Sequence, residues 1–225
     1  QQIPNDKMYN LHLNLNFENC MRYYFFLLVF IFSCTNSFGQ ASRHKPDPAA
    51  KTFLDSATAR YNRSGGDLVL LKEVGELVDK SIKKDSLFMD AWVNKITLQN
   101  QMGQKEAALK TTRRMVKVLP NEVDALYISG IMEYYTGHKK EALVSLNKLL
   151  KIDNNILGKN ENDPKLKGVL INKGIVLILL DRQGEGRMIL ERIFDAEQDP
   201  YVKSYIGFYV NSTKEQIIED RVPGK

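Results

Sequence analysis

Cysteine and histidine are scarce in this sequence, which contains two cysteines and three histidines among 225 residues. Cys20 and Cys34 both lie near the beginning of the chain, so a product cut before Gln40 has neither a disulfide nor a thiolate nucleophile. The histidines have no partner at the spacing of a metal site or a catalytic triad. They are His12, His44 and His138.

Catalytic and cofactor-binding motifs are also missing. The sequence has no glycine-rich phosphate-binding loop, no HExxH and no GxSxG. Adjacent carboxylates such as Glu219 and Asp220 are more typical of a solvated helix face than of an acid–base pair. We therefore expect a protein that is not an enzyme and that uses no cofactor and no metal ion.

The chain lacks a concentrated charge of one sign. It carries 32 basic and 27 acidic residues, a net charge of +5, and its basic clusters, such as Lys83–Lys84 and Arg113–Arg114, are short. A nucleic-acid-binding protein gathers its positive charge on one face, often with aromatic residues between the basic ones. The mixed charges predict solvated helix faces and no nucleic-acid partner.

One run of residues, Tyr23–Phe32, is almost entirely apolar. It follows Met21 and Arg22 and precedes small and polar residues, which is the order of a secretory signal. The run is too short to span a bilayer, which needs about 20 apolar residues. The pattern predicts a signal peptide over residues 21–39, after an extension over residues 1–20 that is disordered or spurious.

Two cleavage positions remain open. Ser37 and Gly39 suit a cut before Gln40, which would release a soluble chain. The residues before Cys34 resemble a bacterial lipobox, in which the cysteine is lipidated and attaches the protein to a membrane. Both predict export to the periplasm or cell envelope of a Gram-negative bacterium. A membrane partner, as an outer-membrane-anchored lipoprotein, follows only if Cys34 is lipidated.

Apolar residues recur three and four positions apart over residues 49–220, which predicts an all-α domain. Residues 40–48 contain two prolines and read as a linker, residues 153–164 read as a polar insertion, and residues 221–225 are expected to be frayed. The expected helices cover residues 49–62, 68–84, 89–102, 105–118, 123–136, 139–152, 165–182, 185–197, 199–211 and 213–220.

Part of this domain repeats at a fixed spacing of 34 residues, which is the signature of a helical repeat array. The matching positions include an acidic residue followed by alanine, a turn glycine, and an alanine–leucine pair. They are Asp90-Ala91 and Asp124-Ala125, Gly103 and Gly137, and Ala108-Leu109 and Ala142-Leu143.

Residues 89–156 resemble two tetratricopeptide repeats. Trp92, Gly103, Ala108 and Pro120 match the family pattern in the first unit, and Leu126, Gly130, Gly137 and Ala142 match it in the second. Departures include Ile96 in place of a small residue, and Gln99 and Glu133 in place of aromatic ones. The resemblance implies a right-handed solenoid of antiparallel helix pairs.

Single glycines have separate expected roles in these units. Gly130 is expected to let the two helices of its pair approach closely, whereas Gly103 and Gly137 turn the chain between helices. A third unit is visible where Lys173-Gly174 mirrors Ser129-Gly130. Its turn glycine is expected to be Gly184, which comes three residues late and predicts a longer first helix.

The family binds peptides or protein segments in a concave groove lined by the first helix of each pair. Carried over by position, the resemblance implies that two sets of residues face such a groove. These are Asp90, Val93, Thr97, Asn100 and Gln101, and Asp124, Tyr127, Ile131, Tyr134 and Tyr135.

Two functions of different classes follow as expectations. The first is a non-catalytic protein-interaction module or scaffold, exported to the cell envelope, that binds a peptide or protein segment of unknown identity. The alternative is a membrane-anchored structural or assembly lipoprotein lipidated at Cys34.

Overall fold

A computed structural model describes residues 44–158, 160 and 163–225, and these residues contain α-helices and no β-strand. The expected all-α class is thus confirmed for the described part of the chain. The predicted signal peptide, the extension before it and Cys34 lie outside the described residues. The helices are α2 (Pro48–Ser64), α3 (Leu68–Lys84), α4 (Met89–Gln101), α5 (Lys105–Val118), α6 (Val123–Tyr135), α7 (Lys139–Leu157), α8 (Lys167–Leu179), α9 (Gln183–Ala196), α10 (Pro200–Asn211) and α11 (Lys214–Arg221), with a short 3-10 helix, η2 (Pro164–Leu166).

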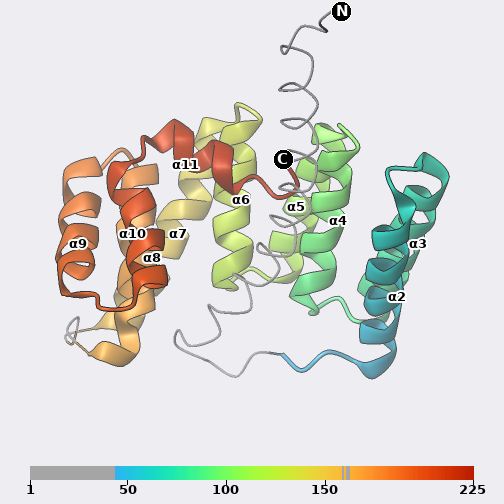
Figure 1. The fold of residues 1–225 in the computed structure, drawn as a ribbon, viewed down its shortest axis with the longest axis horizontal. Helices are drawn as coiled ribbons and strands as arrows, with labels where there is room; N and C mark the ends of the chain where they lie inside the picture. The colour runs from blue at the N-terminus through green and yellow to red at the C-terminus, as the bar shows by residue number, and fades with distance from the viewer. Residues whose placement is uncertain (1–43, 159, 161–162) are drawn as a thin grey trace, which may run out of the picture. The chain divides into compact units, whose positions relative to one another are not determined.

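The helices pack in successive pairs (Figure 1). The closest partners are α2 with α3, α4 with α5, α6 with α7, and α8 with α9, and each pair also contacts the next. Short connections return the chain so that the two helices of a pair lie side by side. Among the described residues, no helix has both the length and the apolar character needed to cross a bilayer.

The turn between the two helices of a pair has the same geometry in α4–α5, α6–α7 and α8–α9. Gly103, Gly137 and Asp181 all have positive φ, at 72°, 85° and 63°. In each case the residue after the turn donates its N–H to the carbonyl five positions before it, at 2.7–2.9 Å. The roles expected for Gly103 and Gly137 are therefore confirmed. The role expected for Gly184 was wrong, because Asp181 makes the turn and Gly184 lies inside α9.

The close approach expected at Gly130 is confirmed. A Cβ added there would lie 2.5 Å from Leu146 Cδ2, so a larger side chain would force Leu146 to move. The third pair repeats this arrangement, since a Cβ at Gly174 would lie 2.8 Å from Leu190 Cγ. Gly174 follows Gly130 by 44 positions, as Asp181 follows Gly137. The third unit thus keeps the geometry of the second after ten additional residues.

Part of these additional residues is helical, which differs from the expected polar insertion. Helix α7 continues to Leu157, which is buried. Asp153 is also buried on this helix and accepts a 2.9 Å hydrogen bond from Asn172 Nδ2 on α8. The extension therefore packs against the third pair, and the connection itself is confined to residues 158–166.

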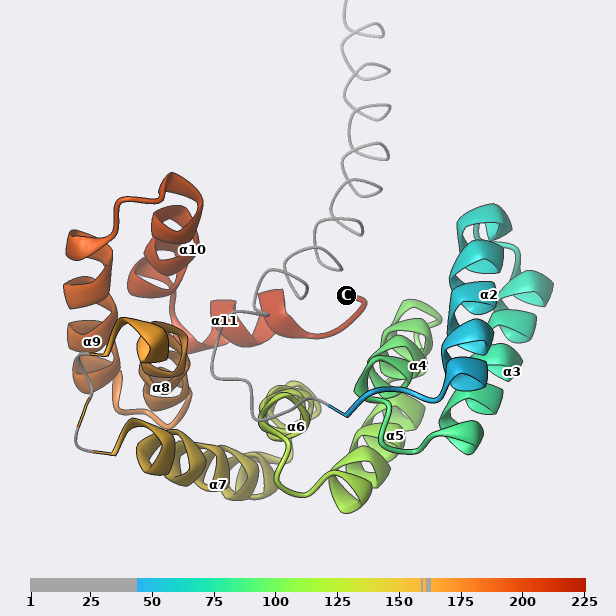
Figure 2. The same ribbon diagram turned by 90° about the horizontal axis from the view of Figure 1, so that it is seen from below.

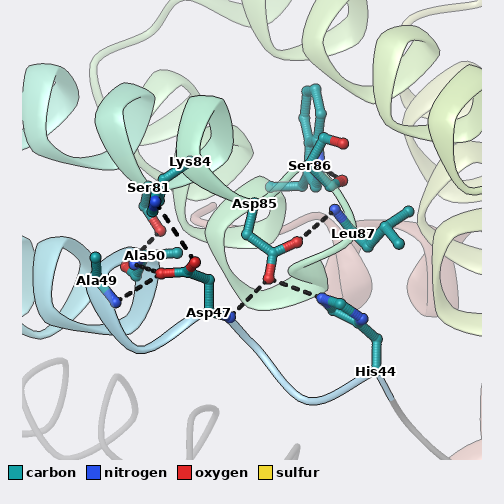
Figure 3. A network of polar contacts seen from close by, with 10 residues as sticks. His44, Asp47, Ala49, Ala50, Ser81, Lys84, Asp85, Ser86 and Leu87 are labelled. Carbon is teal, nitrogen blue, oxygen red and sulfur yellow. Dashed lines mark hydrogen bonds and ion pairs between the residues drawn. The ribbon is translucent and has the colours of Figure 1, made fainter.

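The stretch before α2 is tied to the loop between α3 and α4 (Figure 3). Asp47 caps α2 by accepting from the N–H groups of Ala49 and Ala50. The Asp47 N–H in turn donates to Asp85 Oδ2 at 2.8 Å, and His44 Nε2 lies 2.7 Å from the same oxygen. Burial alone would raise the pKa of the Asp85 carboxyl, but these hydrogen bonds outweigh it and lower the pKa. His44 is therefore held by Asp85, although it has no partner near it in sequence.

Candidate protein-binding surface

The residues expected to line a groove occupy one side of α4 and α6, but they differ in accessibility. Asp90 and Gln101 are exposed, and most of the others are half-buried. Ile131 is the exception, because it has no exposed surface. With the last helix packed on α6, Ile131 is thus part of the core and has no surface open to a ligand. The half-buried residues are Val93, Thr97, Asn100, Asp124, Tyr127, Tyr134 and Tyr135.

Tyr127 is also more enclosed than a groove residue would be. Its hydroxyl oxygen is buried, and desolvation raises the pKa of this hydroxyl well above its usual value. Arg221, Tyr205 and Tyr209 are the nearby groups that act on its titration. The side chain therefore lies under the last two helices rather than on an open surface.

The segment that covers this side is the end of the sequence given, residues 213–225, which we call the returning segment. It consists of α11 with its capping residue Thr213, and of a turn over residues 222–225 in which the Lys225 N–H donates to the Val222 carbonyl. α11 packs on α6, and Figure 2 shows the segment running from the end of α10 across α6 toward α4. Ile217 and Val222 are buried, so the segment is part of the fold. The expectation that residues 221–225 are frayed was wrong for this reason.

Lys214 anchors the beginning of the returning segment. Its Nζ donates to the Tyr134 hydroxyl at 2.8 Å and pairs with the Asp181 carboxylate at 2.9 Å. The same ammonium lies 4.0 Å from the centre of the Tyr134 ring, and the Tyr134 hydroxyl donates to the Leu179 carbonyl at 3.1 Å. The side chain of Lys214 is only 9% exposed, so these contacts satisfy a charge that has left water.

Arg221 ends α11 among aromatic rings of α10. Its guanidinium carbon lies 4.9 Å from the centre of the Tyr209 ring, 5.4 Å from that of Tyr205 and 5.8 Å from that of Phe208. These distances are within the range of cation–π attraction. Tyr209 is buried, whereas Tyr201 on the same helix is 86% exposed. The aromatic residues of α10 therefore hold the returning segment in place.

The turn over residues 222–225 contacts α4 directly. Asn100 Nδ2 donates to the carbonyl oxygen of Pro223 at 2.7 Å. Gly224, with φ of +80°, lies so close to the main chain that an added Cβ would be 2.3 Å from the Thr97 carbonyl oxygen. The Lys225 ammonium lies 5.3 Å from the centre of the Tyr135 ring and pairs with Glu219 of α11.

Four residues expected from the sequence, Thr97, Asn100, Tyr134 and Tyr135, thus meet on one polypeptide segment. Their counterparts on the segment were not expected. The only signal for them was the mixture of apolar and charged residues over 217–225, which a single sequence does not distinguish from a solvated terminus.

Among the described residues, no group of three or more His, Cys, Asp or Glu side chains is arranged to hold a metal ion. His138 is 3.8 Å from Glu133, which is buried and forms a bidentate pair with Arg113 at 2.8 and 2.9 Å. This cluster joins α5 to α6.

Comparisons with known proteins add no further constraint. No model of a known protein family matches the chain, and no curated protein is significantly similar to it in sequence.

Proposed function

We propose that this chain is a non-catalytic interaction module of the tetratricopeptide type, a right-handed solenoid that binds a protein segment on the side of α4 and α6. The observation that carries the proposal is that a polypeptide segment already lies there. The returning segment uses backbone contacts, cation–π contacts and one buried lysine on this side. A surface with these properties is suited to peptide recognition.

The repeated geometry supports the assignment to this type of array. Helices α4, α6 and α8 each have 13 residues, and α5 and α9 each have 14. The turns inside the three pairs and the small residues Gly130 and Gly174 occupy equivalent places. Helix α7 departs from these lengths with 19 residues, because it carries part of the ten additional ones. Repeated units that stack on their neighbours are the defining feature of solenoids. The resemblance of residues 89–156 to tetratricopeptide repeats is the ground on which we propose this family.

Export to the periplasm or cell envelope of a Gram-negative bacterium is proposed from residues 21–39, whose pattern is that of a secretory signal. The lipobox-like residues before Cys34 favour a second candidate, a structural or assembly lipoprotein anchored through that cysteine. Labelling with a palmitate analogue separates the two. A label that Cys34→Ala removes supports the lipoprotein, and an unlabelled periplasmic product supports the soluble module.

Site-specific photocrosslinking tests the binding surface. A photoreactive amino acid at Gln101, which is exposed on α4, should form an adduct with an envelope protein. The matched control is Val144 on α7, which is 71% exposed and lies on the second helix of its pair. An adduct at both positions, or at neither, would contradict the proposal.

A further inference from the structure

We propose that the side of the array away from the returning segment docks on a membrane surface with anionic headgroups. This side carries cations at two equivalent positions in three successive helix pairs, and we call these six residues the basic face. They are Lys80 and Lys83 on α3, Arg114 and Lys117 on α5, and Lys148 and Lys151 on α7. The inference goes beyond the proposed function, which concerns the side of α4 and α6.

The spacing of the repeat brings the six cations to one side. Both positions of the basic face recur every 34 residues, the first as Lys80, Arg114 and Lys148 and the second as Lys83, Lys117 and Lys151. Stacked units present equivalent residues on the same side of an array. Figure 2 shows α3, α5 and α7 on the side away from α11. The two cations of each helix are three positions apart and therefore also share a face.

The basic face has no carboxylate partners within the fold. All six cations are exposed, and in the part of the chain that the structure describes none of them pairs with an acidic group. On α3, Asp79 pairs with Lys95 of α4 instead. On α5 and α7 the exposed acids are Glu106 and Glu141 in the first turn, about 10 Å or more along the helix axis from the nearest cation of the face. Salt screens charges over about 8 Å, so these acids do not neutralise the face.

Two large apolar side chains lie in the same rows as the cations. Val144 precedes Lys148 by four positions on α7 and is 71% exposed. Met188 has the equivalent place on α9, four positions before Arg192, and is 65% exposed. Residues four apart share a helix face. Exposed apolar residues beside cations are typical of helices that lie in a membrane interface, where the apolar groups enter the acyl boundary and the cations reach the headgroups.

Other polyanions match the basic face less well. Helices α3, α5 and α7 contain no aromatic residue, so this side offers no ring for the stacking of unpaired bases. A fixed carboxylate of a protein partner is matched best by arginine, whose guanidinium binds two oxygens at once. Five of the six cations are lysines, which act as flexible point charges. An anionic bilayer therefore suits both the charges and the exposed apolar side chains.

Cosedimentation of the full chain with lipid vesicles measures this interaction. The anionic vesicles contain phosphatidylcholine with about 30% phosphatidylglycerol, and the neutral vesicles contain phosphatidylcholine alone. The wild type should bind the anionic vesicles at least about tenfold more tightly, and about 0.5 M salt should remove this difference. The apolar run of residues 23–32 is present in every protein compared, and the neutral vesicles report any binding that it causes.

The decisive variant combines Lys117→Gln with Lys151→Gln, which removes one charge from α5 and one from α7. It should weaken binding to the anionic vesicles about 25-fold, because each basic residue near such a surface contributes about fivefold. Lys51→Gln with Arg63→Gln is the matched control, since it removes two exposed cations from α2 and lowers the net charge equally. The control should change the affinity by less than about threefold.

Two further variants separate a lipid from a purely ionic partner. Arg114→Gln with Lys148→Gln removes the other equivalent position and should repeat the loss. Val144→Asn leaves the net charge unchanged and should weaken vesicle binding about threefold, because it removes apolar area from the interface. Binding that is unchanged in Val144→Asn but lost in both lysine-containing variants would overturn the choice of a lipid.

Three other results would overturn the inference. They are equal affinity for anionic and neutral vesicles, an equal loss in the α2 control variant, and binding of polyglutamate or duplex DNA without binding of the anionic vesicles. Contact of Val144 with lipid yields no protein adduct. Crosslinking at Gln101 therefore remains an independent test of the proposed function.

Discussion

Replacing Asp153 by asparagine should stabilise the protein, and the gain should appear only as the pH rises. Asp153 is 1% exposed on α7, in contact with Asn172 on α8. Burial raises the pKa of its carboxyl from 3.8 to about 7, against the opposing effects of the Asn172 hydrogen bond and the charge of Lys173. The folded protein therefore holds a proton on Asp153 over a pH range in which the unfolded chain has lost it.

The sign and size follow from proton linkage. The folded pKa, about 7, lies above the unfolded value of 3.8 by about 3, and each pKa unit corresponds to about 1.4 kcal/mol. The folded state binds more protons between these values, so Asp153 lowers the free energy of unfolding as the pH rises from about 4 to about 7. The loss is complete above pH 7 and amounts to about 4 kcal/mol. Asparagine carries no charge at any pH and can still accept the hydrogen bond from Asn172.

Urea denaturation of the wild type and Asp153→Asn across pH 4 to 8 measures this effect. The difference between their free energies of unfolding should grow by about 4 kcal/mol toward pH 8, in favour of the variant. Asp55→Asn is the control, because the side chain of Asp55 is 63% exposed, and its difference should stay within about 0.5 kcal/mol at every pH. A difference for Asp153→Asn that does not change with pH would refute the reasoning, since Asp153 would then ionise in the folded state as it does in the unfolded one.

Two further changes test the packing and the polar contacts of the fold. Gly130→Ala should lower the free energy of unfolding by about 1–2 kcal/mol in urea denaturation, because the new methyl group overlaps Leu146. Gly75→Ala is the control. Its Cβ would meet Leu98 at an ordinary 3.6 Å, so this change should be neutral or stabilising. Asp85→Asn should lower the free energy of unfolding by about 1–3 kcal/mol at pH 7, because it disrupts the hydrogen bonds that the carboxylate accepts from the N–H groups of Asp47 and Leu87. Because the folded pKa of Asp85 is lowered, its contribution is present above the unfolded pKa and is lost as the pH falls through the folded value, so the two proteins should converge in acid. Equal melts of Gly130→Ala and Gly75→Ala, or an Asp85→Asn deficit that persists in acid, would contradict these arguments.

The helical pairs were predictable from the sequence because their determinants are local. Gly103 and Gly137 turn the chain within a few residues, and the spacing of 34 aligns them with the glycine and alanine positions of neighbouring helices. The same locality explains the error in the third pair. The ten additional residues shift the third unit, and Gly184 is the glycine nearest to the expected turn. The turn is instead made by Asp181, because aspartate tolerates the left-handed conformation better than most residues.

The occupation of the α4 and α6 surface was not predictable in this way. Asn100 and Pro223 are 123 positions apart, and Lys214 and Tyr134 are 80 apart. No periodicity connects such residues, and a sequence of mixed polar and apolar residues at an end is equally consistent with a frayed terminus. The side chains of the site were identified from their positions in the repeat, but the segment that they hold could be found only in the structure.

Asp181 links the wrong prediction of the third turn to the docking of the returning segment, which was not predicted. A glycine at this turn would adopt positive φ without strain, as Gly103 and Gly137 do. Glycine, however, has no carboxylate to pair with Lys214, whose ammonium is almost entirely removed from water. A buried cation left without this partner would cost more than the roughly 1 kcal/mol of backbone strain that aspartate carries at the turn. The residue that departs from the repeat pattern is therefore the one that the returning segment requires. In this chain, the turn that lacks glycine is thus also the turn on which the returning segment docks.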